Sequence, residues 1–85
     1  MDNFLGQILL VAFDRIPSGF YPCDGRVLSF KNDRYLEALY SLIGNKWGGD
    51  QRQMTFALPD LRDKAPDPQL QYVISYEGIY PISRD

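Results

Sequence analysis

A single cysteine and a complete lack of histidine limit most strongly how this chain can fold. Cys23 has no second thiol as a partner, so no intramolecular disulfide can cross-link the chain. Without histidine, a zinc site with the usual nitrogen and sulfur ligands is also excluded. A chain of 85 residues buries only about 60 to 65% of its extended surface. We therefore expect one small domain, residues 1–85, held together by packing alone.

The composition is that of a folded protein and excludes two kinds of partner. Hydrophobic residues make up 45% of the chain and charged residues 24%, which is typical of globular domains. The formal net charge of -2 gives no basic surface for nucleic acid. The apolar run 8–13 is too short to cross a bilayer, and residues 1–3 are acidic where an export signal would be basic. We expect a soluble protein without a classical signal peptide.

The first third of the chain predicts strands. Residues 6–13, GQILLVAF, would place apolar side chains on both faces of a strand. This pattern predicts a central strand covered on both faces. Asp24-Gly25 lies between two apolar stretches and favours a type I′ hairpin turn. Pro22 cannot donate to a sheet, so the first arm of this hairpin should be irregular or lie at an edge.

A helix is predicted over residues 32–44. Asn32 is the expected N-cap, and Gly44 can end the helix in the left-handed conformation. One apolar stripe at helical spacing is formed by Tyr35, Leu36, Leu39, Tyr40 and Ile43. A long connection, a short strand over residues 55–58 and a returning strand over residues 70–76 follow. The predicted class is α+β, a short antiparallel or mixed sheet with one main helix.

The stretch 47–61, WGGDQRQMTFALPDL, combines glycines and carboxylates as ligand loops do. A phosphate loop, however, needs a helix directly after its glycines, and here the predicted helix precedes them. Asp50 would in addition repel an anion. We therefore interpret Gly48 and Gly49 as turn glycines.

No set of residues supports catalysis. Cys23 has no histidine to generate its thiolate, so a buried core cysteine is the favoured interpretation. Four loop carboxylates could suggest calcium binding or glycoside hydrolysis: Asp50, Asp60, Asp63 and Asp67. Their spacing does not match an EF-hand, and hydrolysis needs a cleft that a domain of this size rarely forms. Solvated loop charges explain them best, with a weak metal contact left open. We expect no catalytic residues, no metal site and no cofactor.

Aromatic residues offer a binding surface. Most of the six tyrosines and five phenylalanines should be core, because they supply much of the apolar area available for burial. Tyr72 and Tyr76 fall on one face of the predicted final strand. The candidate contacts for a partner protein or a glycan are Trp47, Arg52, Tyr72, Tyr76 and Tyr80.

Five ordered sequence blocks resemble one known family. They are Gly19-Phe20, Cys23-Asp24-Gly25, a helix ending in Leu42-Ile43-Gly44, Trp47-Gly48-Gly49-Asp50, and Phe56-Ala57-Leu58-Pro59-Asp60-Leu61-Arg62. Together they resemble the phage tail collar domain of short tail fibres and of the microcystin-dependent protein family. The resemblance covers residues 4–62, and residues 70–81 are similar to the closing strand of that family.

Three features depart from the family pattern. Residues 51–54 contain one residue more than the corresponding short segment of the family, Gly-Arg-Thr. Asp63 stands where the family commonly has glycine. The short connector 63–69 replaces a longer glycine-rich insertion. The metal-binding receptor head of short tail fibres lies beyond the collar, so neither the metal nor the head is carried over.

The resemblance implies a non-enzymatic structural or attachment component of a phage tail fibre or a phage-tail-like contractile injection particle. Such a protein would be made in the bacterial cytoplasm and end in a virion or an extracellular particle. Its partners would be other tail, baseplate or fibre proteins, or a second copy of this chain, bound through an edge strand or an exposed aromatic patch. The alternative is a glycan- or receptor-binding adhesin module. We expect a monomer or weak oligomer, which leaves room for a trimer in the particle.

Overall fold

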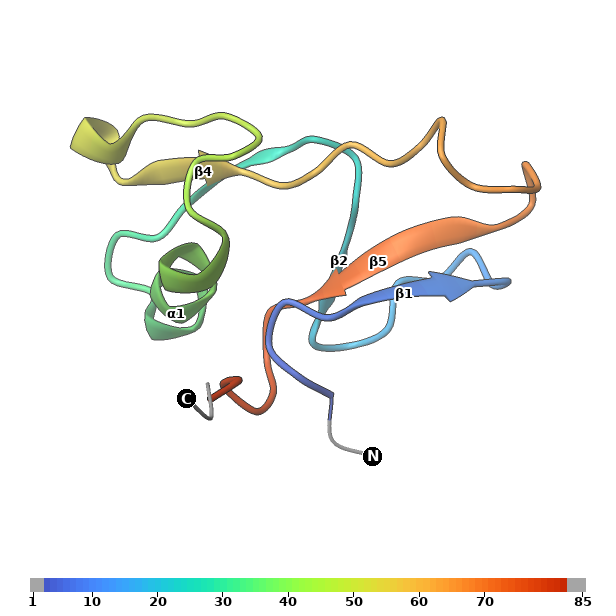
Figure 1. Ribbon diagram of the computed structural model, residues 1–85, viewed down its shortest axis with the longest axis horizontal. Helices are drawn as coiled ribbons and strands as arrows, with labels where there is room; N and C mark the ends of the chain where they lie inside the picture. The colour runs from blue at the N-terminus through green and yellow to red at the C-terminus, as the bar shows by residue number, and fades with distance from the viewer. Residues whose placement is uncertain (1–2, 83–85) are drawn as a thin grey trace.

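Within the described residues, two antiparallel sheets, one α-helix and a short 3-10 helix form the structure (Figure 1). The computed structural model describes residues 3–82. The first sheet has the strand order β1 (Ile8–Val11), β5 (Gln71–Ser75), β2 (Phe20–Pro22). The second pairs β3 (Val27–Ser29) with β4 (Thr55–Ala57). The predicted α+β class is confirmed, and all strand pairs within the two sheets are antiparallel.

The central strand of the first sheet is β5, and the prediction that residues 6–13 form it is wrong. β5 pairs on both sides and includes the fully buried Val73 and Ile74. β1 lies at the edge, where Ile8 and Leu10 are 39% and 40% exposed. A run of apolar residues indicates a tendency toward burial, but it carries no information on how many edges of the strand are paired.

The predicted hairpin at Asp24-Gly25 is also wrong. β2 pairs with β5 and β3 pairs with β4, so the two arms enter different sheets. Gly25 does adopt a positive φ of 79°, as the turn chemistry requires. The glycine therefore turns the chain from one sheet into the other, and Pro22 ends an edge strand as expected.

β3 and β4 are the middle of a longer antiparallel pairing. The N–H of Phe30 donates to the carbonyl of Met54 at 2.9 Å beyond one end of the strands. At the other end, the N–H of Leu61 donates to the carbonyl of Cys23, also at 2.9 Å. We call this pairing the ribbon; its two segments are residues 23–30 and 54–61.

The N-cap of helix α1 (Arg34–Ile43) lies one residue later than predicted. The N-cap is Asp33, whose Oδ1 accepts the N–H groups of Tyr35 and Leu36 at 3.1 Å each. Asn32, the predicted cap, has a φ of 60° instead and lies in the turn before the helix. A carboxylate at the cap adds a favourable interaction with the positive end of the helix dipole, which a neutral amide does not.

The buried face of α1 rests on Leu36 and Leu39. Tyr35, predicted on the apolar stripe, is 52% exposed, so that assignment is wrong. Gly44 ends the helix as expected, with its N–H donating to the carbonyl of Tyr40 at 2.8 Å. Its φ of 60° is positive, but its ψ of -150° lies outside the predicted left-handed helical conformation.

The core lies where α1, the ribbon and β5 meet. Its buried residues are Leu5, Cys23, Phe30, Leu36, Leu39, Phe56, Leu58 and Ile74. Phe30 stacks on Tyr40 with ring centroids 4.3 Å apart, and Phe56 lies beneath both. Burial of such side chains contributes about 1.5 to 3 kcal/mol each. Apolar packing of this kind replaces the absent disulfide. No helix within residues 3–82 is long and apolar enough to cross a membrane.

Candidate functional site

Cys23 joins the two sheets. Its N–H donates to the carbonyl of Tyr72 in β5 at 3.0 Å, while its own carbonyl accepts the N–H of Leu61 at 2.9 Å. The side chain is 3% exposed, which confirms the predicted buried cysteine. Burial, and then the neighbouring Asp24 carboxylate, raise the pKa of the thiol to about 11. The group therefore remains protonated at neutral pH and is a poor nucleophile.

Two acidic residues face each other where the ribbon begins. Asp24 and Asp60 form an isolated antiparallel bridge, which places two like charges opposite each other. Each carboxylate is bound by the arginine two residues later in the chain. Arg26 Nη2 lies 2.9 Å from Asp24 Oδ2, and Arg62 Nη2 lies 2.7 Å from Asp60 Oδ2. We call this place, where Cys23, Asp24 and Asp60 lie between the two sheets, the sheet junction. The two local ion pairs neutralise its charges.

These ion pairs determine the protonation of the two carboxyl groups. Hydrogen bonds from the Arg62 side chain hold the pKa of Asp60 at about 2. The Arg26 side chain likewise lowers the pKa of Asp24. Both groups are therefore ionised and bound at neutral pH, and neither is available as a general acid. Arg26 was missed by sequence reasoning, although the repeated Asp-x-Arg spacing was a usable signal.

The turn glycines allow the chain to pass close to the ribbon. Gly49 has a φ of 106°, and a Cβ at this position would lie 2.6 Å from the carbonyl oxygen of Thr55 and 2.9 Å from the nitrogen of Phe56. Any side chain would therefore collide with main chain atoms. The N–H of Ala57 donates to the carbonyl of Gly48 at 3.0 Å, which holds the segment against β4. The structure agrees with the interpretation of turn glycines.

The segment from Trp47 to Met54, which we call the 47–54 loop, is exposed but firmly held. The Asp50 side chain accepts the Arg52 N–H at 2.9 Å and caps a short 3-10 helix, η1 (Gln51–Gln53). The Asp50 N–H donates to Thr55 Oγ1 at 2.9 Å, and the Thr55 N–H donates back to the Asp50 carbonyl at 3.0 Å. Residues 51–54 thus form an ordered turn.

The side chains of the 47–54 loop extend into solvent. Trp47 is 46% exposed and Met54 45% exposed, and Arg52 is exposed as well. The Lys46 ammonium lies 5.9 Å from the centre of the Trp47 ring. Met54 has a φ of 57°, a left-handed conformation that is uncommon for a side chain other than glycine. The loop therefore exposes an indole, a guanidinium and a thioether to solvent, with Trp47 near the Ala57 end of β4 and Met54 at its Thr55 end.

The predicted tyrosine contacts lie elsewhere. Tyr72, in β5, and Tyr76, just after it, pack in part against the core, and the Tyr76 ring centroid lies 4.7 Å from that of Tyr21. Tyr80 is 46% exposed, with its hydroxyl 2.9 Å from Ser41 Oγ on α1. The 47–54 loop projects at the opposite end of the molecule from β5 (Figure 1). The five candidate contacts thus do not form one patch.

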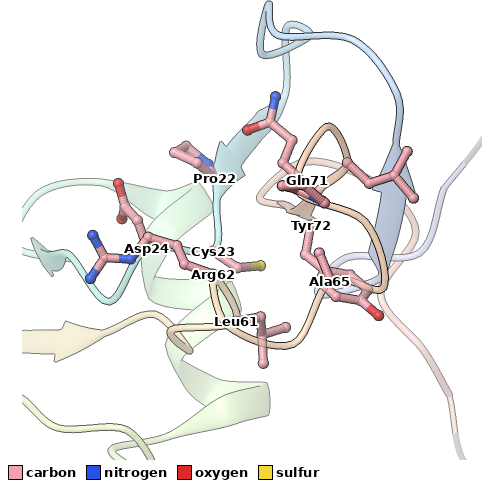
Figure 2. Close-up of a pocket in the computed structure, with 10 residues that line it drawn as sticks. Pro22, Cys23, Asp24, Leu61, Arg62, Ala65, Gln71 and Tyr72 are labelled. Atoms are coloured by element: carbon pink, nitrogen blue, oxygen red, sulfur yellow. The ribbon is translucent and has the colours of Figure 1, made fainter.

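A cavity of about 410 Å³ lies beside Cys23 (Figure 2). It is lined by Pro22, Cys23, Asp24, Leu61, Arg62, Ala65, Pro68, Leu70, Gln71 and Tyr72. Several of its polar groups already have partners: the two charged residues are ion-paired, and Gln71 Nε2 donates to the Phe13 carbonyl at 2.7 Å. Within residues 3–82, no cluster of three or more histidine, cysteine or acidic side chains could hold a metal ion.

Comparison with known families identifies the fold. The family model for the phage tail collar domain matches residues 6–66, more than half of the chain. The chain belongs to the phage tail collar domain family. The matched range in this collar domain includes both segments of the ribbon, α1 and the 47–54 loop. No curated protein matches the chain.

Membership in this family indicates a structural role in a phage tail. The sequence blocks that carried the resemblance come together in the collar domain. Cys23-Asp24-Gly25 and the Leu58–Arg62 block lie side by side in the ribbon, and the Gly48-Gly49 pair lies against β4. These blocks therefore maintain the fold at the junction of the two sheets.

Proposed function

We propose that this collar domain is a non-enzymatic attachment component of a phage tail fibre or of a phage-tail-like injection particle, and that it docks through the 47–54 loop. The observation that supports the proposal is the difference between the main chain and the side chains of the loop. Its main chain is held by hydrogen bonds to β4, while its side chains remain exposed. A surface of this kind is suited to bind another protein.

The residue types support protein docking. Tryptophan, arginine and methionine are enriched at the centres of protein interfaces, where a few such residues supply most of the binding energy. The loop presents one of each at Trp47, Arg52 and Met54. Because its backbone is already ordered, binding would cost less conformational entropy than the ordering of a flexible loop. The partner we propose is a tail, baseplate or fibre protein.

A binding measurement with alanine variants tests the proposal. Purified protein is titrated against the tail, baseplate and fibre proteins encoded beside it, with biolayer interferometry as the readout. Arg52→Ala and Met54→Ala should each weaken binding by about tenfold or more, as expected for interface anchors. Tyr35→Ala is the matched control, because Tyr35 is equally exposed but lies on α1. Equal affinities for all variants would reject the loop as the docking site.

The half-exposed indole of Trp47 favours one other candidate, a glycan-binding module. Aromatic rings stack on the apolar faces of sugars, and the Lys46 ammonium beside the ring could bind an acidic sugar. A glycan array probed with the wild-type protein and with Trp47→Ala decides between the two. Binding that disappears in the variant would favour the adhesin. A blank array for the wild-type protein would eliminate it.

A further inference from the structure

The outer edge of β1 is an open hydrogen-bonding edge. β1 pairs with β5 on one side, and no strand within residues 3–82 pairs with its other side. An unpaired edge presents main chain N–H and C=O groups that can pair with another extended segment. The two β1 residues with the more exposed side chains, Ile8 and Leu10, add apolar surface to this edge.

The register shows which main chain groups face outward. The Ser75 N–H donates to the carbonyl of Gln7 at 2.9 Å, so Gln7 points toward β5. In an antiparallel ladder, inward-facing residues alternate with outward-facing ones. Ile8 and Leu10 therefore direct their N–H and C=O groups away from β5. The other side of β5 is consistent with this, since Tyr72, opposite Leu10, bonds through its carbonyl to Cys23.

The edge of β1 lacks the protection that the edges of β2 and β4 have. β2, the opposite edge of the same sheet, ends in Pro22, which has no N–H. The edge of β4 is covered by the 47–54 loop through the bond from Ala57 to Gly48. Residues 6–13 contain no proline, lysine or other charged side chain. Edges that natural proteins keep free of partners usually carry such residues.

The partner that fits this edge is a second β1. The uncharged segment 6–13 can lie antiparallel to its own copy without opposing like charges. With a two-fold axis at Leu9, Ile8 faces Leu10 of the other copy, and each outward N–H meets an outward carbonyl. The half-exposed Phe13 at one end of the strand would then lie near Phe4 of the second copy. Apolar side chains at both ends of the seam would be covered.

We propose that two copies of this chain associate through antiparallel pairing of β1, forming one continuous sheet across a two-fold axis at Leu9. The association is isologous, because each copy uses the same edge. It is independent of the docking proposed for the 47–54 loop, since the loop and β1 lie at opposite ends of the molecule (Figure 1).

Light scattering after size-exclusion chromatography tests the association. The mass should rise from 9.8 kDa toward twice that value as the protein concentration increases. Leu10→Lys places a charge beside the seam in both copies and should lower the association constant by about tenfold or more. Val27→Lys is the matched control, because Val27 is 60% exposed on β3. Thermal melting of each variant establishes that it is folded.

Disulfide trapping tests the position of the axis. Leu9 would face Leu9 of the other copy as a non-hydrogen-bonded pair, with Cα atoms about 4.5 Å apart. That separation allows a disulfide. Leu9→Cys should therefore oxidise to a covalent dimer much faster than the control Val27→Cys, both in a Cys23→Ala background. Non-reducing electrophoresis measures the two rates.

Three results would overturn the proposal. The first is a monomer at all concentrations, with equal cross-linking of the two cysteine variants. The second is a dimer that Leu10→Lys leaves unchanged, which would indicate another interface. The third is a monomer that binds a tail protein through β1. This result would reject a second copy as the occupant and leave the proposed attachment function intact.

Discussion

The sheet junction and the 47–54 loop are built from similar residues and use them in opposite ways. Both contain glycines, aspartates and arginines. At the junction, the charged side chains bind one another, as Asp24 with Arg26 and Asp60 with Arg62. In the loop, the Asp50 carboxylate accepts the main chain N–H of Arg52, and the Arg52 side chain is left exposed. The junction is thus neutralised and structural, whereas the loop is ordered and available for contact.

The largest expected effect concerns the close approach at Gly49. Gly49→Ala should lower the free energy of unfolding by about 3 kcal/mol or more, because the new Cβ collides with the Thr55 carbonyl and the φ is unfavourable. Gly44→Ala is the control, since its φ is also positive but nothing lies within 4 Å. It should cost less, about 1 to 3 kcal/mol, because only the backbone conformation, with a φ of 60° and a ψ of -150°, is unfavourable for alanine. Urea denaturation measures both, and equal losses would show that strain alone matters.

The second prediction concerns the thiol at the junction. At pH 8, Cys23 in the folded protein should react with iodoacetamide about 100-fold more slowly than in the unfolded chain, because its pKa is raised to about 11. The pKa of this thiol is about 9 in the unfolded chain and about 11 in the folded protein. Its contribution to the free energy of unfolding is therefore fully present below pH 9 and is lost as the pH rises from about 9 to about 11. Mass spectrometry follows the labelling. Rapid labelling under native conditions would contradict the burial of Cys23.

A smaller effect is expected at the acidic pair. In Arg62→Gln, the pKa of Asp60 should rise from about 2 toward the ordinary value near 4. Because the folded pKa is depressed, the contribution of this pair to stability is present above pH 4 and lost as the pH falls toward about 2. The pair is exposed, so the change in stability should be small. NMR titration measures the pKa, with Arg26→Gln as the control that should mainly affect Asp24.

The smallest stability effect should be that of Arg52→Ala. Its side chain lies in solvent, so the free energy of unfolding should change by less than about 0.5 kcal/mol, while partner binding falls. A large loss of stability would mean that the loop side chains support the fold, and the contrast with the junction would disappear. Chemical denaturation and binding on the same preparation give both values.

Local patterns were a good guide to some elements of this protein. The helix, the strand at β4 and the returning strand at β5 were predicted to within about two residues, because periodicity and turn residues act over short distances. The Asp-x-Arg spacing was not used to predict the ion pairs, and it also occurs at Asp50 and Arg52, between which the described residues show no ion pair. The prediction that Asn32 caps the helix was wrong because two adjacent residues were both suitable caps.

Errors arose where partners come from distant parts of the chain. β1 is an edge strand because β2 pairs with the other side of β5. The paired residues of β2 and β5 are more than fifty positions apart in the sequence. The separation of β2 from β3 depends on β4 and β5 together. No local pattern contains this information, since a strand shows the same alternation whether one or both of its edges are paired.

The sequence by itself determined the collar family, the α+β class, the buried cysteine and the turn glycines, because these follow from residue type and short spacing. Only the tertiary structure decided that Cys23 links two sheets, that Asp24 and Asp60 meet, and that β1 has an open edge. Each of these depends on main chain hydrogen bonds between segments far apart in the sequence. Such bonds depend on which backbones meet and little on the side chains they carry.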